Sequence, residues 1–300
     1  VQRYQHRFTA MGGPCQFQLD ADNENTALAA LQDAEAEVKR LESKYSRYRG
    51  DSLLSQINDS AGSGQAVAID EETRTLLEYA DTMWQQSEGL FDISSGVLRQ
   101  AWDFRSDTLP QQQSIDEQLE KVGWQHASLS TAGITLPLEK MELDLGGLVK
   151  EYACDSAATV LRASGCKNGL VDLAGDIVVL GPPINSSSWP IGIRHPQQLN
   201  QPLAEISLAY GALATSGNYE RGMTIDGIRY SHILNAKTGW PVSGLASVSI
   251  QAEQCLVAGS LATLAMLKPA SEALEWLNTL GLPWLAVDQD MNISGAINDQ

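Results

Sequence analysis

The chain of 300 residues has no run approaching the ~18 apolar residues of a membrane helix, so we expect no membrane span. It also contains no G-x-x-x-x-G-K-[ST] and no G-x-G-x-x-G sequence, which excludes the usual nucleotide-binding loops as a recognisable signal. The first residues, VQRYQHRF, are polar and show no signal peptide, although a trimmed chain would look the same.

Positive charge is scarce. Twenty Lys and Arg stand against 37 Asp and Glu, giving a net charge of −17 at pH 7. Such a chain repels a nucleic-acid backbone or an anionic membrane, so we expect neither as a general partner. An anionic substrate must therefore be held by a local positive patch or by a metal ion.

Cysteine is also scarce, and none of the four cysteines lies in a C-x-x-C pair: Cys15, Cys154, Cys166 and Cys255. Two of them, Cys154 and Cys255, fall in apolar helical patterns. This favours buried thiols over disulfides, and the spacings argue against zinc. Unpaired cysteines indicate a reducing compartment, so we expect a cytoplasmic location, or a periplasmic one if a signal has been removed.

The remaining composition is that of a globular protein, with 43% hydrophobic and 19% charged residues. Predicted helices and strands alternate irregularly, which favours a mixed-sheet α/β or α+β domain over a regular doubly wound sheet. No linker and no internal repeat divides the chain. We therefore expect one large domain over 1–300, with helices packed around a β-sheet.

The centre of the chain carries the most informative pattern. The apolar spacing predicts a strand over 143–145, a tight turn at Gly146-Gly147, a helix from Leu148 to a stop at Gly165, and a strand over 177–180. A glycine turn that leads into a helix N-terminus is a natural place for phosphate, and Lys150 adds a cation there. The alternative is an ordinary strand–helix–strand unit with a solvated lysine.

Other elements follow from periodicity and end signals. Asp70 is expected to cap a helix that stops at Gly89, and Ser114 with Glu117 a helix that ends at Gly123. The further predicted helices span 26–45, 255–267 and 271–280, and the further predicted strands cover 8–19 (interrupted at 11–14), 190–193, 203–208, 248–250 and 284–287.

Four polar residues are candidates for chemistry, each with a structural alternative. His232 lies in a polar, glycine-bounded loop and could act as a general base, or could be a loop histidine bonded to the backbone. Ser216 could be a nucleophile, but it lacks the G-x-S-x-G elbow and could equally cap backbone. Asp172 and Asp176 bracket Gly175 and could bind a metal or a ribose hydroxyl, or could serve the turn.

Seven segments, in order along the chain, resemble motifs of the ApbE family. TAMGGP (9–14) resembles A-M-G-T, SRYRGDSLLSQIN (46–58) resembles S-x-Y-x-x-D-S-x-L-x-x-x-N, and FDISSGVLRQAWDF (91–104) resembles F-D-x-T-x-G-P-L-x-x-L-W-x-F. LDLGGLVKEYACD (143–155) is similar to L-D-L-G-G-I-A-K-G-Y-A-x-D, and LVDLAGDIVVLG (170–181) to the G-G-D-I strand. ATSGNY (214–219) and YSHILNAKTGWPV (230–242) resemble T-S-G-x-Y and Y-S-H-I-I-D-P-x-T-G-x-P.

The resemblance implies an ApbE-like α+β fold and the activity of an FAD:protein FMN transferase. Such an enzyme moves FMN from FAD to a Thr or Ser hydroxyl of an acceptor flavoprotein and releases AMP. His232 is then the base that deprotonates the incoming hydroxyl. The positions that match FAD-contacting residues of the family are Met11, Tyr48, Leu90, Phe91, Asp92, Asp144, Lys150 and Leu234.

The resemblance also implies a Mg²⁺ ion, and here the sequence departs from the family. The family's A-D-A-L-A-T supplies Asp and Thr ligands, whereas AGSLAT (258–263) keeps Thr263 and has Gly259 in place of the Asp. The backbone carbonyl of Gly147 matches the family's main-chain ligand. Because Mg²⁺ prefers at least one carboxylate, we expect weakened binding. Two further departures, Glu151 for Gly and Asn235 for Asp, fall near the expected pyrophosphate.

Gly259 suggests one alternative to the transferase, a relative that binds FAD without efficient catalysis. A further alternative is an FAD pyrophosphatase that releases free FMN.

Overall fold

The fold is organised on an eight-stranded sheet. The computed structural model describes residues 1–198, 201–219 and 222–297. The strand order is β1-β2-β5-β6-β9-β12-β13-β14, and each neighbouring pair is antiparallel. The bounds are β1 Gln2–Ala10, β2 Gly13–Ala21, β5 Gly169–Leu173, β6 Asp176–Gly181, β9 Gly211–Gly217, β12 Ser247–Ala252, β13 Trp284–Val287 and β14 Ile293–Ala296.

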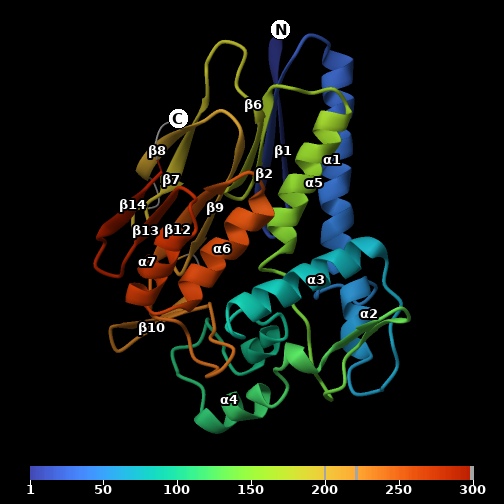
Figure 1. Ribbon diagram of the computed structural model, residues 1–300, viewed down its shortest axis with the longest axis vertical. Coiled ribbons are helices and arrows are strands. Elements are labelled where there is room, and N and C mark those ends of the chain that lie inside the picture. The colour runs from blue at the N-terminus through green and yellow to red at the C-terminus, as the bar shows by residue number, and fades with distance from the viewer. Residues whose placement is uncertain (199–200, 220–221, 298–300) are drawn as a thin grey trace.

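Three helices lie side by side over one face of this sheet (Figure 1): α1 (Glu24–Tyr45), α5 (Val149–Ala163) and α6 (Cys255–Leu267). Helix α1 is amphipathic, and Leu31, Val38 and Leu41 on its inner face are fully buried. Helix α6 is apolar on most sides because it packs between α5, the sheet and α7 (Ala270–Thr279). The main hydrophobic core lies between these helices and the sheet.

The opposite face of the sheet is covered by the hairpin β7 (Trp189–Arg194) and β8 (Pro202–Leu208). Strand β7 alternates buried and exposed residues along its whole length, the pattern of a strand with one face in a core. Its buried side packs on residues of β5, β6 and β9, including Ile177 and Leu213. The sheet therefore has two differently covered faces.

The remaining elements gather at one end of the layered body (Figure 1). They comprise α2 (Leu53–Asp59), α3 (Glu71–Gln86), α4 (Gln112–Leu119), the 3₁₀ turns η1 (Ser95–Gln100) and η2 (Trp124–His126), and the two-stranded pairs β3 (Ser128–Ser130) with β4 (Gly133–Thr135) and β10 (Gly222–Ile225) with β11 (Ile228–Ser231).

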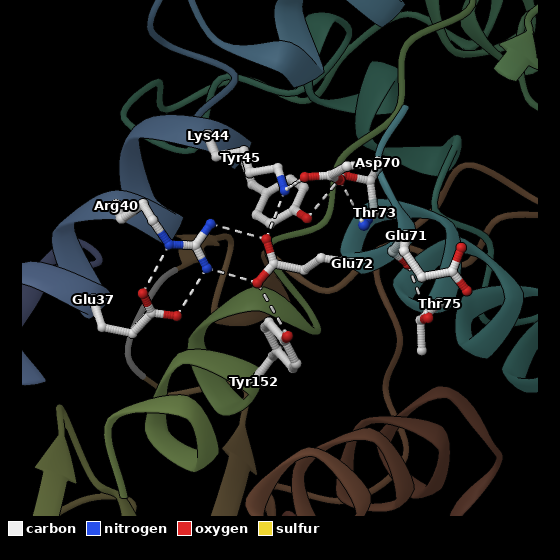
Figure 2. A network of polar contacts seen from close by, with 10 residues as sticks. All are labelled: Glu37, Arg40, Lys44, Tyr45, Asp70, Glu71, Glu72, Thr73, Thr75 and Tyr152. Carbon is white, nitrogen blue, oxygen red and sulfur yellow. Dashed lines mark hydrogen bonds and ion pairs between the residues drawn. The ribbon is translucent and has the colours of Figure 1, made fainter. Parts of the chain in front are cut away.

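A polar network joins this end to the helical layer (Figure 2). Glu72 of α3 accepts hydrogen bonds from Arg40 (2.6 and 2.9 Å) and Lys44 (2.6 Å) of α1, and from the Tyr152 hydroxyl of α5 (3.1 Å). The bonds from Arg40, first, and from Lys44 lower the pKa of Glu72 to about 2, although burial acts in the opposite direction. Three helices that are far apart in the sequence are thus tied through one carboxylate.

Most of the expected elements are confirmed. Helix α6 and strand β13 have the predicted bounds, and Asp70 caps α3 by accepting a hydrogen bond from the Thr73 backbone N–H at 3.0 Å. The α+β class is confirmed, and the sheet is antiparallel throughout the described residues. All four cysteines are free thiols, three of them buried. No helix in the described ranges has the length and apolarity needed to cross a membrane.

The strand predicted over 143–145 is wrong, although the alternation behind it is real. Leu143 and Leu145 are buried, but the backbone of this segment has no strand beside it. Instead, Leu143 exchanges two hydrogen bonds with the Asn58 side chain (2.8 and 3.0 Å), and the Asp144 N–H donates to the Ile93 carbonyl at 2.7 Å. Side-chain and loop partners thus satisfy an extended backbone that would otherwise need a sheet.

Two other local predictions are also wrong. The stretch 8–19 is not one interrupted strand but two full strands, β1 and β2, paired as a hairpin. The capping box at Ser114 and Glu117 does not form, because α4 begins earlier, at Gln112, and ends at Leu119. Glu117 accepts a hydrogen bond from the Gln113 side chain at 3.0 Å, one turn before it, rather than capping the helix.

Candidate functional site

The glycine turn before α5 is tied to Asp144. The Gly146 N–H donates to Asp144 Oδ1 at 2.9 Å, and Arg47 forms an ion pair with the other carboxylate oxygen. Arg47 also donates to the Tyr48 hydroxyl at 2.7 Å and lies 4.9 Å from the centre of that ring. Tyr48 is 80% exposed, so the face of its ring that Arg47 does not cover is open to a ligand. The structure thus brings together Asp144 and Tyr48, and adds Arg47, which the motif comparison missed.

The segment that starts at Phe91 lies against the same turn. A Cβ placed on Gly147 would be 3.6 Å from the Phe91 ring, and one placed on Gly96 would be 2.4 Å from Asp144 Cβ. Leu90 packs on the main core. Asp92 is buried and holds its own loop, since it accepts hydrogen bonds from the Ser94 N–H and hydroxyl and from the Trp124 N–H.

Met11 lies in the turn between β1 and β2 with a positive φ of 54°. Its backbone N–H donates to Glu42 Oε1 of α1 at 2.6 Å. Non-glycine residues rarely adopt this conformation, and the hydrogen bond to Glu42 contributes to holding it. Its side chain packs at the edge of the main core.

A cluster of charged groups lies where α5 begins. Lys150, in the first turn, places its Nζ 2.9 Å from Asp176 Oδ2 at the start of β6. Asp176 is buried, and burial raises its pKa, although Lys150 and the backbone N–H of Thr215 act in the opposite direction. The lysine of this turn is therefore not an ordinary solvated side chain.

Glu151, the next residue, is only 6% exposed. Burial and the nearby negative charge of Asp176 raise its pKa to about 7. Within the described part of the chain, its Oε2 has no hydrogen-bond partner. Its side chain lies against Gly259 of α6, where a Cβ would come within 2.4 Å of Glu151 Cγ.

Two hydroxyl side chains meet between β9 and α6. Ser216 of β9 and Thr263 of α6 are joined by a hydrogen bond of 2.9 Å between their side-chain oxygens. Thr263 follows Gly259 by four residues, so both are on one face of α6. The Ser216 side chain thus bonds to another side chain and does not cap a backbone group, which was the structural alternative for this residue.

The loop around His232 is held by its own polar side chains. Ser231 accepts a hydrogen bond from the Ile233 N–H at 3.0 Å, and the Gly239 carbonyl accepts one from Trp102 at 2.8 Å. Leu234 pairs with Pro241 and belongs to the small apolar cluster around Trp102. The segment 91–104 therefore contacts both the glycine turn, through Phe91, and the His232 loop, through Trp102.

Comparison with known proteins shows which family the chain belongs to. A sequence profile of the ApbE family matches residues 11–285, which is most of the chain. The chain belongs to the ApbE family. The resemblance drawn from the seven motifs is confirmed.

Individual relatives of this ApbE-family chain agree with the profile. Proteins named FAD:protein FMN transferase are 29% identical in Vibrio cholerae over 233 residues and 32% identical in Treponema pallidum over 255 residues. The matches cover 75% and 78% of this chain, and 69% and 70% of those proteins. The crystal structure of the ApbE protein of Thermotoga maritima has a TM-score of 0.89 and 28% identity, and the superposition covers 98% of this chain and 97% of that one.

A metal ion in this ApbE chain would have to be held by few protein groups. Among the described residues, no three His, Cys, Asp or Glu side chains are grouped so as to hold one. Two hard oxygen donors are nevertheless present: the unpartnered oxygen of buried Glu151, and the Thr263 hydroxyl one turn of α6 beyond Gly259, which packs on Glu151. Mg²⁺ is commonly bound by one or two carboxylates together with substrate phosphates, so these donors fit it.

A cavity of about 490 Å³ lies on the other side of β9, facing the β7–β8 hairpin. Leu213 and Thr215 line it, whereas Ser216, the next residue, points to α6. Asp172 also lines this cavity and accepts a hydrogen bond from the Gly175 N–H at 2.8 Å, which supports its turn role. The cavity is therefore separate from the Lys150 cluster, and the sheet lies between them.

Proposed function

We propose that this ApbE-family chain transfers FMN from FAD to a Thr or Ser hydroxyl of an acceptor flavoprotein and releases AMP. The observation that carries the proposal is the family match over 11–285, within which relatives are named FAD:protein FMN transferase. The contacts among the motif residues add support, since Tyr48, Phe91, Asp144 and Gly147 lie around one glycine turn.

Binding of FAD to so acidic a protein requires local attraction for the diphosphate. Lys150 and the N-terminus of α5 supply it, because the N-terminus of a helix carries partial positive charge. The exposed ring of Tyr48 offers aromatic surface to the flavin or adenine. The predicted FAD contacts Met11, Leu90, Asp92 and Leu234 remain part of this proposal.

The proposed reaction is a displacement at phosphorus. The acceptor hydroxyl oxygen attacks the FMN phosphorus, its proton passes to His232, and the phosphoanhydride bond to AMP breaks, so that AMP leaves with the bridging oxygen. A bound Mg²⁺, held by the Gly147 carbonyl and Thr263, would polarise the phosphoryl oxygens and stabilise the charge on AMP. The other protein groups bind and orient the substrate.

The test is incubation of the protein with FAD, Mg²⁺ and a threonine-containing acceptor peptide, followed by mass spectrometry of the peptide. An adduct of FMN mass on the threonine, with equimolar AMP, is the expected result. Replacing that threonine by alanine should abolish the adduct. No adduct with any divalent cation would overturn the proposal.

A second candidate is an FAD carrier, which the missing carboxylate at Gly259 favours. A carrier would retain intact FAD in stoichiometric amount and release no AMP in the same experiment. A pyrophosphatase would instead yield free FMN and AMP with no modified peptide. We also propose a cytoplasmic location, which the four free cysteines support.

A further inference from the structure

Glu151 and Gly259 occupy one small volume between α5 and α6. A Cβ on residue 259 would lie 2.4 Å from Glu151 Cγ, 3.0 Å from its Cδ and 2.9 Å from its Oε1. No residue with a side chain fits at 259 while Glu151 keeps this position. The Glu151 side chain on α5 can therefore take this position only because residue 259 on α6 is glycine.

The carboxylate in that volume lacks a partner. Glu151 is 6% exposed, and its Oε2 has no hydrogen-bond partner among the described residues. Burying a carboxylate oxygen without a partner costs several kcal/mol, so such atoms usually mark a ligand or a functional group.

The charges around Glu151 also leave an excess of negative charge. Asp176 is buried beside it, and Lys150 is the cation that pairs with Asp176 at 2.9 Å. Two buried carboxylates thus face one ammonium group. A divalent cation would reverse the sign of the cluster and make it attractive to an anionic diphosphate.

A hydroxyl group lies on the same face of α6 as Gly259. Thr263 is one helical turn from Gly259, and its hydroxyl is fixed by Ser216 at 2.9 Å. A glutamate carboxylate and a threonine hydroxyl are hard oxygen ligands of the kind that Mg²⁺ and Mn²⁺ accept.

We propose that Glu151 supplies the acidic ligand of the divalent cation, with its carboxylate placed from α5 into the space that Gly259 leaves open on α6. The inference rests on the proposed function for its role in the reaction, but cation binding itself can be measured without any transfer. It also accounts at once for two of the departures from the family pattern, those at positions 151 and 259. In this chain the carboxylate ligand comes from α5, in place of the family's carboxylate on α6, so the cation site keeps an acidic ligand.

The experiment is a titration of the full chain with Mn²⁺, followed by the loss of the free-ion EPR signal, with and without FAD. Glu151→Gln keeps the size of the side chain and removes the charge. Changes even to groups that only support a metal ligand cost about 10–100-fold in affinity, so loss of a direct ligand should weaken Mn²⁺ binding at least tenfold. Glu253→Gln, at an exposed residue near the start of α6, is the matched control and should bind Mn²⁺ like the unmodified protein.

A double variant tests the pairing of the two positions. Glu151→Gly together with Gly259→Asp returns the carboxylate to α6 and should bind Mn²⁺ within about threefold of the unmodified protein. Circular dichroism on each variant checks that it is folded. Unchanged Mn²⁺ binding in Glu151→Gln would overturn the inference, and a folded double variant that binds no better than Glu151→Gln would contradict the pairing.

These results are distinguishable from failure of the proposed function. If Mn²⁺ binding depends on Glu151 but no peptide is modified, the inference stands and the transferase proposal fails. If peptide is modified equally well by Glu151→Gln and the unmodified protein in Mg²⁺, the transferase proposal stands and this inference is overturned.

Discussion

Replacement of Lys150 by methionine should have two separable effects, one on FAD binding and one on stability. The side chain is 29% exposed and its Nζ lies 2.9 Å from buried Asp176. Removing a charge-assisted contact to a phosphate costs about 1.5–3 kcal/mol, which corresponds to roughly 10–150-fold weaker binding of FAD. Removing the partner of a buried carboxylate costs about 3–5 kcal/mol of unfolding free energy, because Asp176 is then left buried without its cation.

A second variant separates these two effects. Lys150→Met combined with Asp176→Asn removes the stranded charge, so it should recover most of the lost stability while FAD binding stays weak. Lys39→Met, at an exposed lysine of α1, removes one positive charge elsewhere and should change neither property by more than about 0.5 kcal/mol.

Two measurements decide the outcome. Quenching of flavin fluorescence gives the dissociation constant for FAD, and urea denaturation gives the unfolding free energy. Unchanged FAD affinity in a folded Lys150→Met variant would refute the placement of the diphosphate at the start of α5. Equal stability of Lys150→Met and the unmodified protein would refute the assignment of Lys150 as the counter-ion of Asp176.

Two further predictions concern the network of α1, α3 and α5 and the glycine turn. Glu72→Gln should cost about 1–2 kcal/mol at pH 7 after solvent screening is allowed for, and Glu71→Gln, whose carboxylate points away from the network in Figure 2, should cost almost nothing in urea denaturation. The pKa of Glu72 is lowered from 4.5 to about 2, so its contribution to the unfolding free energy is fully present above pH 4.5 and disappears as the pH falls through 2. The unfolding free energies of Glu72→Gln and of the unmodified protein should therefore become equal near pH 2. Gly96→Ala places a Cβ 2.4 Å from Asp144 Cβ, so it should weaken FAD binding in the fluorescence assay, and unchanged affinity would contradict a role for Asp144 in the site.

The elements that sequence periodicity predicted well are those whose burial pattern repeats over several turns. Helix α1 is an example, because Leu31, Val38 and Leu41 recur on one buried face. Helix α6, which is apolar on most sides, was predicted instead from the clear ends of its apolar run. The segment 143–145 differs from such helices, since a buried alternation predicts an extended chain but not the groups that pair with its backbone. Here the partners are the Asn58 side chain and the Ile93 carbonyl, which lie on distant loops. Only the folded chain brings them together.

The candidate site likewise combines residues that the sequence predicted with residues that it did not. Motif order pointed to Asp144, Gly147 and Lys150, and the structure brings their turn to Phe91 and Tyr48. Arg47 was missed because its partner, Asp144, lies 97 residues away, and only its position beside Tyr48 could have drawn attention to it.

The Glu151–Gly259 pair was seen in the sequence as two unrelated departures. Their side-by-side packing depends on how α5 crosses α6, which no local pattern reveals.

The most direct test of the whole account is a crystal structure of the protein with FAD and Mn²⁺, with the metal located by its anomalous signal. We expect the FAD diphosphate at the start of α5 beside Lys150, one Mn²⁺ bound by Glu151, Thr263 and phosphate oxygens, and His232 facing the FMN phosphorus. FAD bound instead in the cavity between β9 and the β7–β8 hairpin, with no metal at Glu151, would contradict the account.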